Sequence, residues 1–368
     1  MKKLLVALPL LICGLANAQE KPLDMKMDFE DYNPPSSLVV PEHRIKRAKF
    51  PFIDIHNHYG SMNTADLSER VKFMDELNMG VMVNLSGRGF RSSGDHLEKS
   101  FENIKKQYPN RFLLFTNIDF EDIDNPAWAG RMTKQLEEDV KRGAKGLKIY
   151  KSLGIRNKDK NGNWLAIDDP RIDPVWAKCG ELGIPVLIHS ADPKQFWDPI
   201  DNQNERWLEL KLHPNRRYDS TFSSWETIIE QQHNVFKKHT KTKFINAHLG
   251  WYGSDLKKLG ELMDQFPNMY TEIGAVIAEL GRQPRAAKAF LTKYQNRVLF
   301  GKDSWVPDEY ETYFRVLETE DEYFLYHKRY HAFWRMYGLG LSDEVLKKIY
   351  YKNAMSLIPS IDKTLFPK

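Results

Sequence analysis

The chain has 368 residues, of which 41% are hydrophobic and 28% are charged, a balance typical of a folded globular protein and not of a disordered one. The net charge is +4, from 54 basic and 50 acidic residues, and this near balance argues against a nucleic-acid-binding surface. Because there are only two cysteines, a disulfide scaffold and a cysteine-rich metal site are both excluded.

The first 18 residues have the pattern of a cleaved secretory signal peptide. Two lysines precede an apolar stretch of 13 residues from Leu4 to Ala16, and the sequence Ala-Asn-Ala ends at Ala18. A membrane span needs about 20 apolar residues, so this stretch is too short to serve as an anchor. We therefore expect cleavage after Ala18, export to the periplasm or the exterior, and a mature chain without a membrane anchor. That mature chain would keep a single cysteine, Cys179.

Residues 19–49 are polar, and we expect them to form an N-terminal arm before a domain that covers residues 50–368. Eight apolar, β-branched runs occur in this domain, and amphipathic stretches with helical spacing separate them. The runs cover residues 52–56, 80–85, 112–118, 144–150, 184–189, 243–249, 268–273 and 297–301.

Alternating strands and helices favour parallel strand pairing, and eight such units close into a (β/α)₈ TIM barrel of the α/β class. The usual size of this barrel, about 250 residues, matches the region from residue 50 to residue 305. A doubly wound open sheet is the alternative fold. It is less favoured, because no glycine-rich phosphate-binding loop follows the first run.

Two segments add to the barrel. Residues 306–368 are mainly helical, and their last helix is expected to run from Ser342 to about Leu357. Within the barrel, Ser254 is a candidate N-cap for the helix that begins near Leu256. Residues 190–219 have no clear period, and they follow the fifth run, so we expect them at the catalytic face of the barrel. This loop carries the aromatic and basic residues Trp197, Arg206, Trp207, His213, Arg216, Arg217 and Tyr218.

Polar residues with metal-ligand chemistry come at the ends of several predicted strands. Side chains alternate along a strand, so Asp54, His56 and His58 share one face. His189 and His248 end the strands expected in the fifth and sixth runs, Lys148 ends that of the fourth, and the eighth run leads to Asp303. Burying so many polar groups without partners would be costly, and a bound metal ion would offset that cost.

Imidazole and carboxylate ligands without thiolates suit Zn²⁺, with Mn²⁺ or Fe²⁺ as competitors. A divalent ion lowers the pKa of water to about 7 and can polarise a carbonyl group. Asp303 could accept the proton of the water, and a remaining histidine could act as a general acid or base. Glu272 ends the seventh run, and it either lines the pocket or forms a buried ion pair.

The motifs FIDIHNH, PVLIHS, FINAHLG and LFGKDS together resemble those of the amidohydrolase superfamily. The resemblance is to its amidohydrolase-related branch, which includes lactonases and nonoxidative decarboxylases, and it covers about residues 50–358. It implies that one metal ion is bound by four residues and that His248 is the catalytic acid or base. The implied metal ligands are His56, His58, His189 and Asp303.

The chain departs from the family pattern at Lys302, where threonine is usual, and we expect this lysine to point outward. Two-metal relatives carry a carboxylated lysine on the fourth strand, but a substrate-binding or structural role is preferred for Lys148 because one metal ion is usual in this branch. Arg216 and Trp197 are the other candidates for substrate binding, and this loop suits an anionic or sugar-like ligand.

The favoured function is hydrolysis of a lactone, amide or ester-like carbonyl in a small molecule that is sugar-derived or carries a carboxylate. Export favours hydrolysis mildly, because envelope enzymes commonly process imported polymers and their fragments. The alternative is a nonoxidative decarboxylase that uses the same metal site. A noncatalytic binding protein is the third hypothesis, but it would require a lost ligand, and all of the ligands are present. The sequence leaves the oligomeric state open, a homo-oligomer included.

Overall fold

The computed structural model describes residues 24–89, 94–328 and 334–367. The predicted signal peptide, residues 1–18, lies outside these described residues. Contacts divide the chain into two units, Met1–Val39 and Val40–Lys368. In the first unit, residues 24–39 are exposed and contain one turn, at residues 29–31. No helix in the described parts of the chain is long and apolar enough to cross a bilayer.

The second unit is built on parallel strands in two hydrogen-bonded sets, in the orders β1-β2-β3 and β4-β5-β6-β7-β8-β9. Each of the eight predicted runs contains a strand, although most of the strands are shorter than predicted. The strands are β1 (Phe52–Asn57), β2 (Met79–Asn84), β3 (Phe112–Leu114), β4 (Thr116–Asn117), β5 (Leu147–Ile149), β6 (Val186–Ile188), β7 (Phe244–Asn246), β8 (Met269–Glu272) and β9 (Val298–Leu299).

Two further hydrogen-bond contacts close these sets into one barrel. The Phe115 N–H, between β3 and β4, donates to the carbonyl of Asn84 at 3.0 Å, so β3 and β4 act as one interrupted barrel strand. The Ile55 N–H donates to the carbonyl of Phe300 at 3.0 Å, which joins β1 to the end of β9. The prediction of a (β/α)₈ barrel is therefore confirmed.

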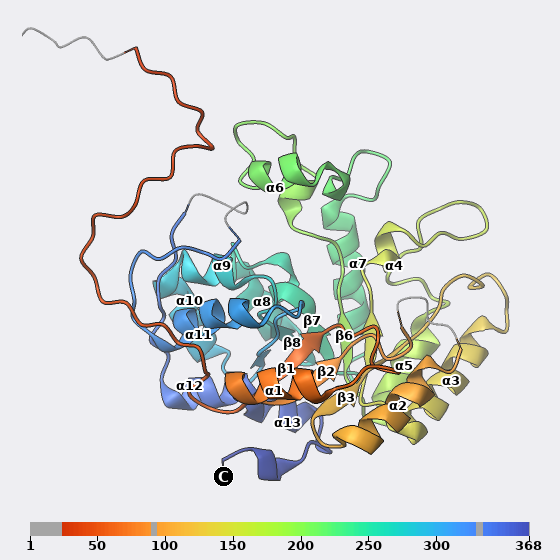
Figure 1. Ribbon diagram of the computed structural model, residues 1–368. Coiled ribbons are helices and arrows are strands. Elements are labelled where there is room, and N and C mark those ends of the chain that lie inside the picture. Colours follow the sequence, from red (N-terminus) through yellow and green to blue (C-terminus); the bar gives the residue numbers. More distant parts are fainter. Residues whose placement is uncertain (1–23, 90–93, 329–333, 368) are drawn as a thin grey trace, which may run out of the picture. The chain divides into compact units, whose positions relative to one another are not determined.

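Helices surround the strands, as Figure 1 shows, and they pack apolar faces against them. In α1, for example, the residues that are buried recur at helical spacing: Val71, Met74 and Leu77. The longer helices are α1 (Ser68–Leu77), α2 (His96–Gln107), α3 (Trp128–Arg142), α5 (Asp173–Leu182), α7 (Trp225–Lys238), α8 (Leu256–Gln265), α10 (Pro284–Lys293) and α11 (Tyr310–Glu318).

Helix caps show one correct prediction and one wrong one. Ser342 caps the C-terminal helical segment as predicted, and its side chain accepts from the Val345 N–H. That segment consists of α12 (Asp343–Lys347), a π-helical turn (Lys348–Lys352) and α13 (Asn353–Leu357). Ser254 is not the cap of α8. Asp255 is the N-cap, because it directly precedes Leu256, the first residue of α8, and its carboxylate accepts from the Lys258 N–H at 2.9 Å.

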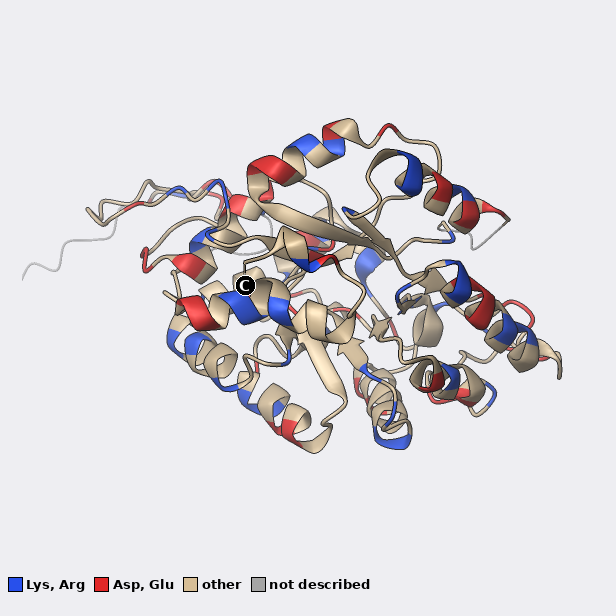
Figure 2. Cartoon of the chain, turned by 90° about the horizontal axis from the view of Figure 1, so that it is seen from below, with Lys and Arg blue, Asp and Glu red and all other residues tan. Residues whose placement is uncertain are grey.

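The connection after β6 is long and contains only short helices: η1 (Lys194–Phe196), α6 (Trp207–Leu212) and η2 (Pro214–Arg216). Other short helices are α4 (Ser152–Ile155), which is kinked at Leu153 and Gly154, η3 (Ala247–Trp251), α9 (Ile277–Gly281), η4 (Pro307–Glu309) and η7 (Lys363–Leu365). Figure 2 shows Lys and Arg interspersed with Asp and Glu along the outer helices of the barrel.

Candidate metal centre

The first histidines of the site are positioned by the end of β1. His56 is fully buried, and the Asp54 carboxylate, two residues earlier, accepts its backbone N–H at 3.1 Å. The same carboxylate accepts the Lys302 N–H at 3.1 Å and the Tyr310 hydroxyl at 2.6 Å. Asp54 therefore fastens β1 to the segment after β9, and it serves the site by holding its scaffold.

Asp303 lies against both histidines of the H-x-H motif. Its Oδ1 atom is 3.2 Å from His56 Nε2 and 3.7 Å from His58 Nε2. These three residues form a group whose possible ligand atoms all lie within 4.8 Å of one another. These contacts join the first and the last strand of the barrel, because His56 belongs to β1 and Asp303 follows β9.

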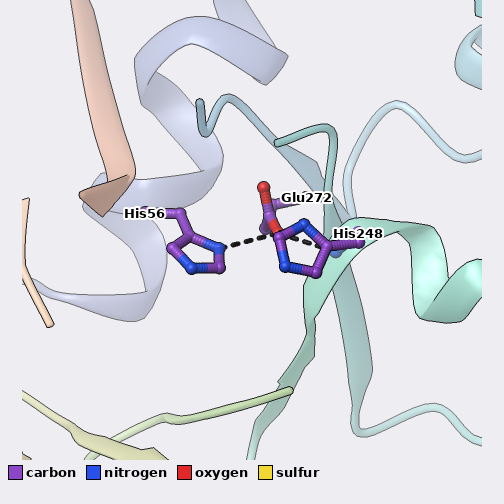
Figure 3. Close-up of side chains that lie close together, drawn as sticks. All are labelled: His56, His248 and Glu272. Carbon is purple, nitrogen blue, oxygen red and sulfur yellow. Dashed lines mark hydrogen bonds and ion pairs between the residues drawn. The ribbon is translucent and has the colours of Figure 1, made fainter. Parts of the chain in front are cut away.

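A second group contains a residue for which the sequence left two roles open. Glu272, at the end of β8, lies between His56 and His248 in Figure 3. Its Oε1 atom is 3.0 Å from His56 Nδ1, 3.6 Å from His248 Nδ1 and 2.7 Å from the His248 N–H. Of the two roles considered, the structure shows the buried, paired carboxylate.

Two glycines make room for the Glu272 carboxylate. A Cβ atom at Gly301 would lie 2.4 Å from Glu272 Oε2 and 3.0 Å from His56 Cβ, and one at Gly274 would lie 2.6 Å from Glu272 Oε2. Both distances to the oxygen are shorter than real Cβ contacts allow. Gly301, the only glycine in the Gly301-Lys302-Asp303 sequence, is therefore needed to leave space for the Glu272 side chain.

His248 lies in a turn and not in a strand. Its φ angle is 57°, and Leu249, Gly250 and Trp251 also have positive φ angles. Its Nδ1 is 2.8 Å from the Gly274 carbonyl, which can only accept, so Nδ1 carries the proton and Nε2 has the lone pair. His248 Nε2 is buried and has no hydrogen-bond partner.

His189 and Lys148 complete the predicted set but make fewer contacts. The ring of His189 is 4.4 Å from the ring of His248, between centroids, and its buried Nε2 has no hydrogen-bond partner. Its ligand atoms do not belong to either compact group described above. Lys148 in β5 is also buried, and its ammonium has no hydrogen-bond partner.

The charges of these groups favour a cation. Burial opposes ionisation of Glu272 and Asp303, but the histidines outweigh it, so that the pKa of Glu272 falls to about 2 and that of Asp303 lies well below its ordinary value. Burial and Lys148 oppose the charged form of His56, yet these two carboxylates raise its pKa above its ordinary value. Glu272 and Asp303 thus attract a proton to His56, which lies between them, and the same negative charge would attract a metal ion.

The other imidazoles are held neutral, which metal binding requires. Burial lowers the pKa of His58 to about 3, helped by the nearby His56 and Lys148. Burial likewise lowers the pKa of His189 and of His248. The buried Nε2 atoms of His189 and His248 have no hydrogen-bond partner, and they lie beside ionised carboxylates, so the residues present fit a divalent metal ion.

Backbone strain gathers around the same place. Ala191 after β6, His248 after β7, Ala275 after β8 and Asp303 after β9 all have φ angles between 56° and 81°. Residues other than glycine rarely adopt these values, and such strain is concentrated at functional sites. Each of the four successive strands β6 to β9 is therefore followed, within four residues, by a strained residue.

The two predicted substrate contacts in the loop after β6 are engaged with the loop itself. The Arg216 guanidinium pairs with Glu209. The Trp197 ring stacks on Tyr218 with centroids 4.1 Å apart, and its indole N–H donates to the Ser223 carbonyl at 3.0 Å. Tyr218 in turn donates to Asp192, whose carboxylate is 3.9 Å from His189 Nε2.

Lys302 does not point into solvent, so this expectation was wrong. Its side chain is 1% exposed, and its ammonium pairs with Glu309 and with Ser304. The surroundings explain the difference, because the segment after β9 is covered by the Pro307–Glu309 turn (η4) and α11.

Sequence reasoning did not single out Ser86 and Tyr150. His58 Nδ1 is 2.8 Å from the Ser86 hydroxyl, and that hydroxyl is 2.9 Å from the Tyr150 hydroxyl. These contacts orient the ring of His58 so that its Nε2 faces Asp303. Each residue follows a strand end closely, β2 for Ser86 and β5 for Tyr150, and this position was the available signal.

Comparison with known proteins bears on the fold and the family of this chain. Solved structures with the same fold include a TIM-barrel protein from Bordetella bronchiseptica (16% identity, 84% of this chain and 98% of that one, TM-score 0.53). A 2,6-dihydroxybenzoate decarboxylase from Rhizobium (14%, 84% and 99%, 0.51) and a manganese-bound dihydroxybenzoic acid decarboxylase from Polaromonas (14%, 86% and 99%, 0.54) are others. At such identities these likenesses show the fold alone. The family model described as amidohydrolase matches residues 53–359, so the chain belongs to the amidohydrolase family.

Proposed function

We propose that this metal-dependent enzyme hydrolyses a lactone, amide or ester-like carbonyl of a small molecule. One observation carries the proposal: the Asp303 Oδ1 atom lies 3.2 Å from His56 Nε2 and 3.7 Å from His58 Nε2, yet 35% of the Asp303 side chain remains exposed. A carboxylate held in the metal-binding group and still open to water is what hydrolysis needs.

His56, His58 and Asp303 would hold the divalent ion that this family binds, with His189 as a further imidazole. Zn²⁺ is our proposal for its identity, because the donors are nitrogen and carboxylate oxygen in a buried site. When bound, such an ion acts as a Lewis acid that polarises a carbonyl and makes water more acidic.

The remaining roles belong to the chain's own residues. Asp303 is ionised, so its oxygen can accept the proton of the attacking water. His248 Nε2 carries a lone pair without a partner, so it can take a proton and pass it to the leaving group, and its charged form can stabilise the oxyanion. Glu272 keeps the His248 backbone and the His56 ring in place.

Lys148 is our candidate for binding a carboxylate or a carbonyl oxygen of the substrate. Burial lowers its pKa to about 8, against the attraction of Asp303 and Glu272, so it remains largely charged at pH 7. A buried ammonium without a hydrogen-bond partner is costly, and an anionic group of the substrate would satisfy it.

The buried Lys148 ammonium makes nonoxidative decarboxylation the second candidate function, because a decarboxylase must bind the carboxylate that it removes. His248 Nε2, which carries a lone pair, would first take a proton from water or from a substrate hydroxyl and would then deliver it to the carbon that loses CO₂. The two reactions give different products, and these products decide between them.

The test uses the purified protein, analysed for metals and then assayed with two sets of compounds. Neutral and carboxylated lactones, esters and amides are followed by acid release, and hydroxylated aromatic acids are followed by CO₂ release. About one divalent ion per chain together with acid release supports the proposal. Release of CO₂ alone would replace it with decarboxylation, and a folded protein with no metal affinity would refute both.

We further propose that the protein is exported, on the strength of the pattern that ends at Ala18. Expression in a Gram-negative host with its own start codon, followed by N-terminal sequencing, should yield a periplasmic chain that starts at Gln19. An uncleaved chain in the cytoplasm would contradict this proposal.

A further inference from the structure

A chain of hydroxyl groups connects the ring of His58 to the ends of two other strands. His58 Nδ1 is 2.8 Å from the Ser86 hydroxyl, which is 2.9 Å from the Tyr150 hydroxyl. The Tyr150 hydroxyl in turn lies 3.3 Å from the carbonyl oxygen of Leu85. The contacts therefore run from an imidazole of the metal centre, past the ends of β2 and β5, to a backbone carbonyl.

The carbonyl at the end of this chain gives the protons a direction, because a carbonyl can only accept. When Tyr150 donates to the Leu85 carbonyl, its oxygen can accept from Ser86, and the Ser86 oxygen can accept a proton on His58 Nδ1. The Leu85 carbonyl also accepts from Asn117 Nδ2 at 2.9 Å, and its two lone pairs serve both donors. In this direction every contact of the chain is a hydrogen bond.

The opposite direction loses one of these hydrogen bonds. Tyr150 would donate to Ser86 and Ser86 to His58 Nδ1, so the Tyr150 hydroxyl would no longer donate to the Leu85 carbonyl. The proton of His58 would then be on Nε2, which is 3.7 Å from Asp303 Oδ1, too far for a hydrogen bond between these two atoms. That proton would also occupy the lone pair with which an imidazole nitrogen binds a metal ion.

Tyr150 acts on His58 in a second way, through its ring. The two rings are stacked, with centroids 5.8 Å apart and an angle of 29° between their planes. This contact restrains the imidazole, but it does not determine which ring nitrogen carries the proton, because only the hydroxyl takes part in the hydrogen-bond chain. Phenylalanine at this position would keep the stacking and remove the hydroxyl, so the two contributions can be separated.

We propose that Ser86 and Tyr150 are positioning residues of the metal centre: their hydroxyls keep the proton of His58 on Nδ1 and leave the Nε2 lone pair for the metal ion. The inference rests on the metal centre of the proposed function, and it holds whether the reaction releases an acid or CO₂. Groups that accept the other ring N–H of a metal-binding histidine typically contribute about 10–100-fold to metal affinity or activity.

NMR of ¹⁵N-labelled histidine rings reads the position of this proton, because protonated and unprotonated ring nitrogens have well-separated chemical shifts. Spectra are recorded on the Zn²⁺-loaded protein and again after the ion is removed with EDTA, at about pH 8, well above the ordinary pKa of histidine. The His58 signals are those missing from His58→Gln. We expect the proton on Nδ1 in both states, and a metal-free protein with the proton mainly on Nε2 would overturn the inference.

Tyr150→Phe tests the hydroxyl by itself. The Ser86 O–H then loses its acceptor and can turn toward His58 Nδ1, so the share of Nε2–H should rise and Zn²⁺ affinity, measured by competition with a chelator, should fall about 10–100-fold. The matched control is Tyr294→Phe, which removes a buried hydroxyl that donates to the Gly260 carbonyl at 3.0 Å, between α10 and α8. Wild-type affinity and an unchanged tautomer in Tyr150→Phe, or an equal loss of affinity in both variants, would overturn the inference.

The same measurements separate this inference from the proposed function. If the wild type binds Zn²⁺ and hydrolyses a lactone, ester or amide while the His58 proton is on Nε2 in the metal-free protein, the inference fails and the hydrolase stands. If the proton is on Nδ1 and Tyr150→Phe weakens Zn²⁺ binding, but none of these compounds is hydrolysed, the hydrolase fails and the positioning roles of Ser86 and Tyr150 stand.

Discussion

Asp303 holds an uncommon backbone conformation, with a φ angle of 81°, and its N–H donates to the His56 carbonyl at 2.7 Å. This hydrogen bond joins the segment after β9 to β1 and directs the carboxylate toward two imidazoles. The strained backbone of Asp303 places its carboxylate against the two imidazoles, and an extended backbone at this position would not place it there.

Replacing Asp303 by asparagine should reduce the rate more than the metal content. The amide keeps one oxygen for the metal but cannot accept a proton, so we expect kcat to fall on the order of 10²–10⁴-fold. Metal analysis and kinetics on the same sample provide the measurement, and His58→Ala, which removes a ligand nitrogen, should lose metal and activity together. Wild-type activity in Asp303→Asn would remove this residue from catalysis.

His248 should act on the substrate, because its unpartnered Nε2 faces the site while Nδ1 is held by Gly274. We expect His248→Ala to keep its metal and to lose kcat on the order of 10²–10⁴-fold, with partial recovery when imidazole is added. Metal content by elemental analysis and kcat with and without imidazole are the measurements. A variant that loses its metal would show that His248 is a ligand instead.

At the scale of secondary-structure elements, the alternating apolar runs predicted eight strands because strands buried on both faces have continuous apolar sequences. The same reasoning extended several runs too far. His248 was placed at a strand end, but β7 stops at Asn246 and a left-handed turn follows. Backbone turns of this kind depend on hydrogen bonds from other elements, here the Glu272 carboxylate, which a local pattern does not contain.

Gly301→Ala tests how closely the strand ends are fitted. The added methyl group would displace the Glu272 carboxylate, which orients His56 and His248. Because residues that orient metal ligands typically contribute 10–100-fold, we expect metal affinity or kcat/KM to fall about 10–100-fold. Gly130→Ala in α3 is the matched control, since a Cβ atom there would meet no neighbour within 4 Å. Equal metal affinity in both variants would contradict this account.

The molecule as a whole should lose stability in mild acid because several buried histidines are neutral when folded. His233 in α7 is the clearest case outside the metal centre. Burial, with help from Lys258, lowers its pKa to about 4 from an ordinary value of 6.5. Between these values the unfolded chain binds a proton that the folded chain does not, so the free energy of unfolding falls as pH drops from 6.5 toward 4.

His233→Phe should remove this part of the pH dependence. Phenylalanine can replace the ring among Phe236, Tyr252 and Phe266 without gaining a proton in the unfolded state. The free energy of unfolding of the variant minus that of the wild type should be on the order of 1–2 kcal/mol larger at pH 5 than at pH 8. Urea unfolding at both pH values gives the comparison, and an equal difference at pH 5 and pH 8 would show that His233 does not titrate in this way.

From the sequence, barrel class and most of the site were predictable for one physical reason. In a parallel barrel every strand ends at the same face, so polar residues at several strand ends must converge, whatever the details of packing. His56, His58 and Asp303 converge in this way, and His248 and His189 lie beside them. The amidohydrolase family was identified on the same residues.

Tertiary structure alone decided which polar group meets which. Glu272 became the partner of His56 and His248 because Gly274 and Gly301 leave space for its carboxylate. Lys302 is buried and not outward because Glu309, from the turn before α11, reaches its ammonium. Such pairings depend on side-chain distances between elements far apart in the chain, and these distances arise only when the barrel closes.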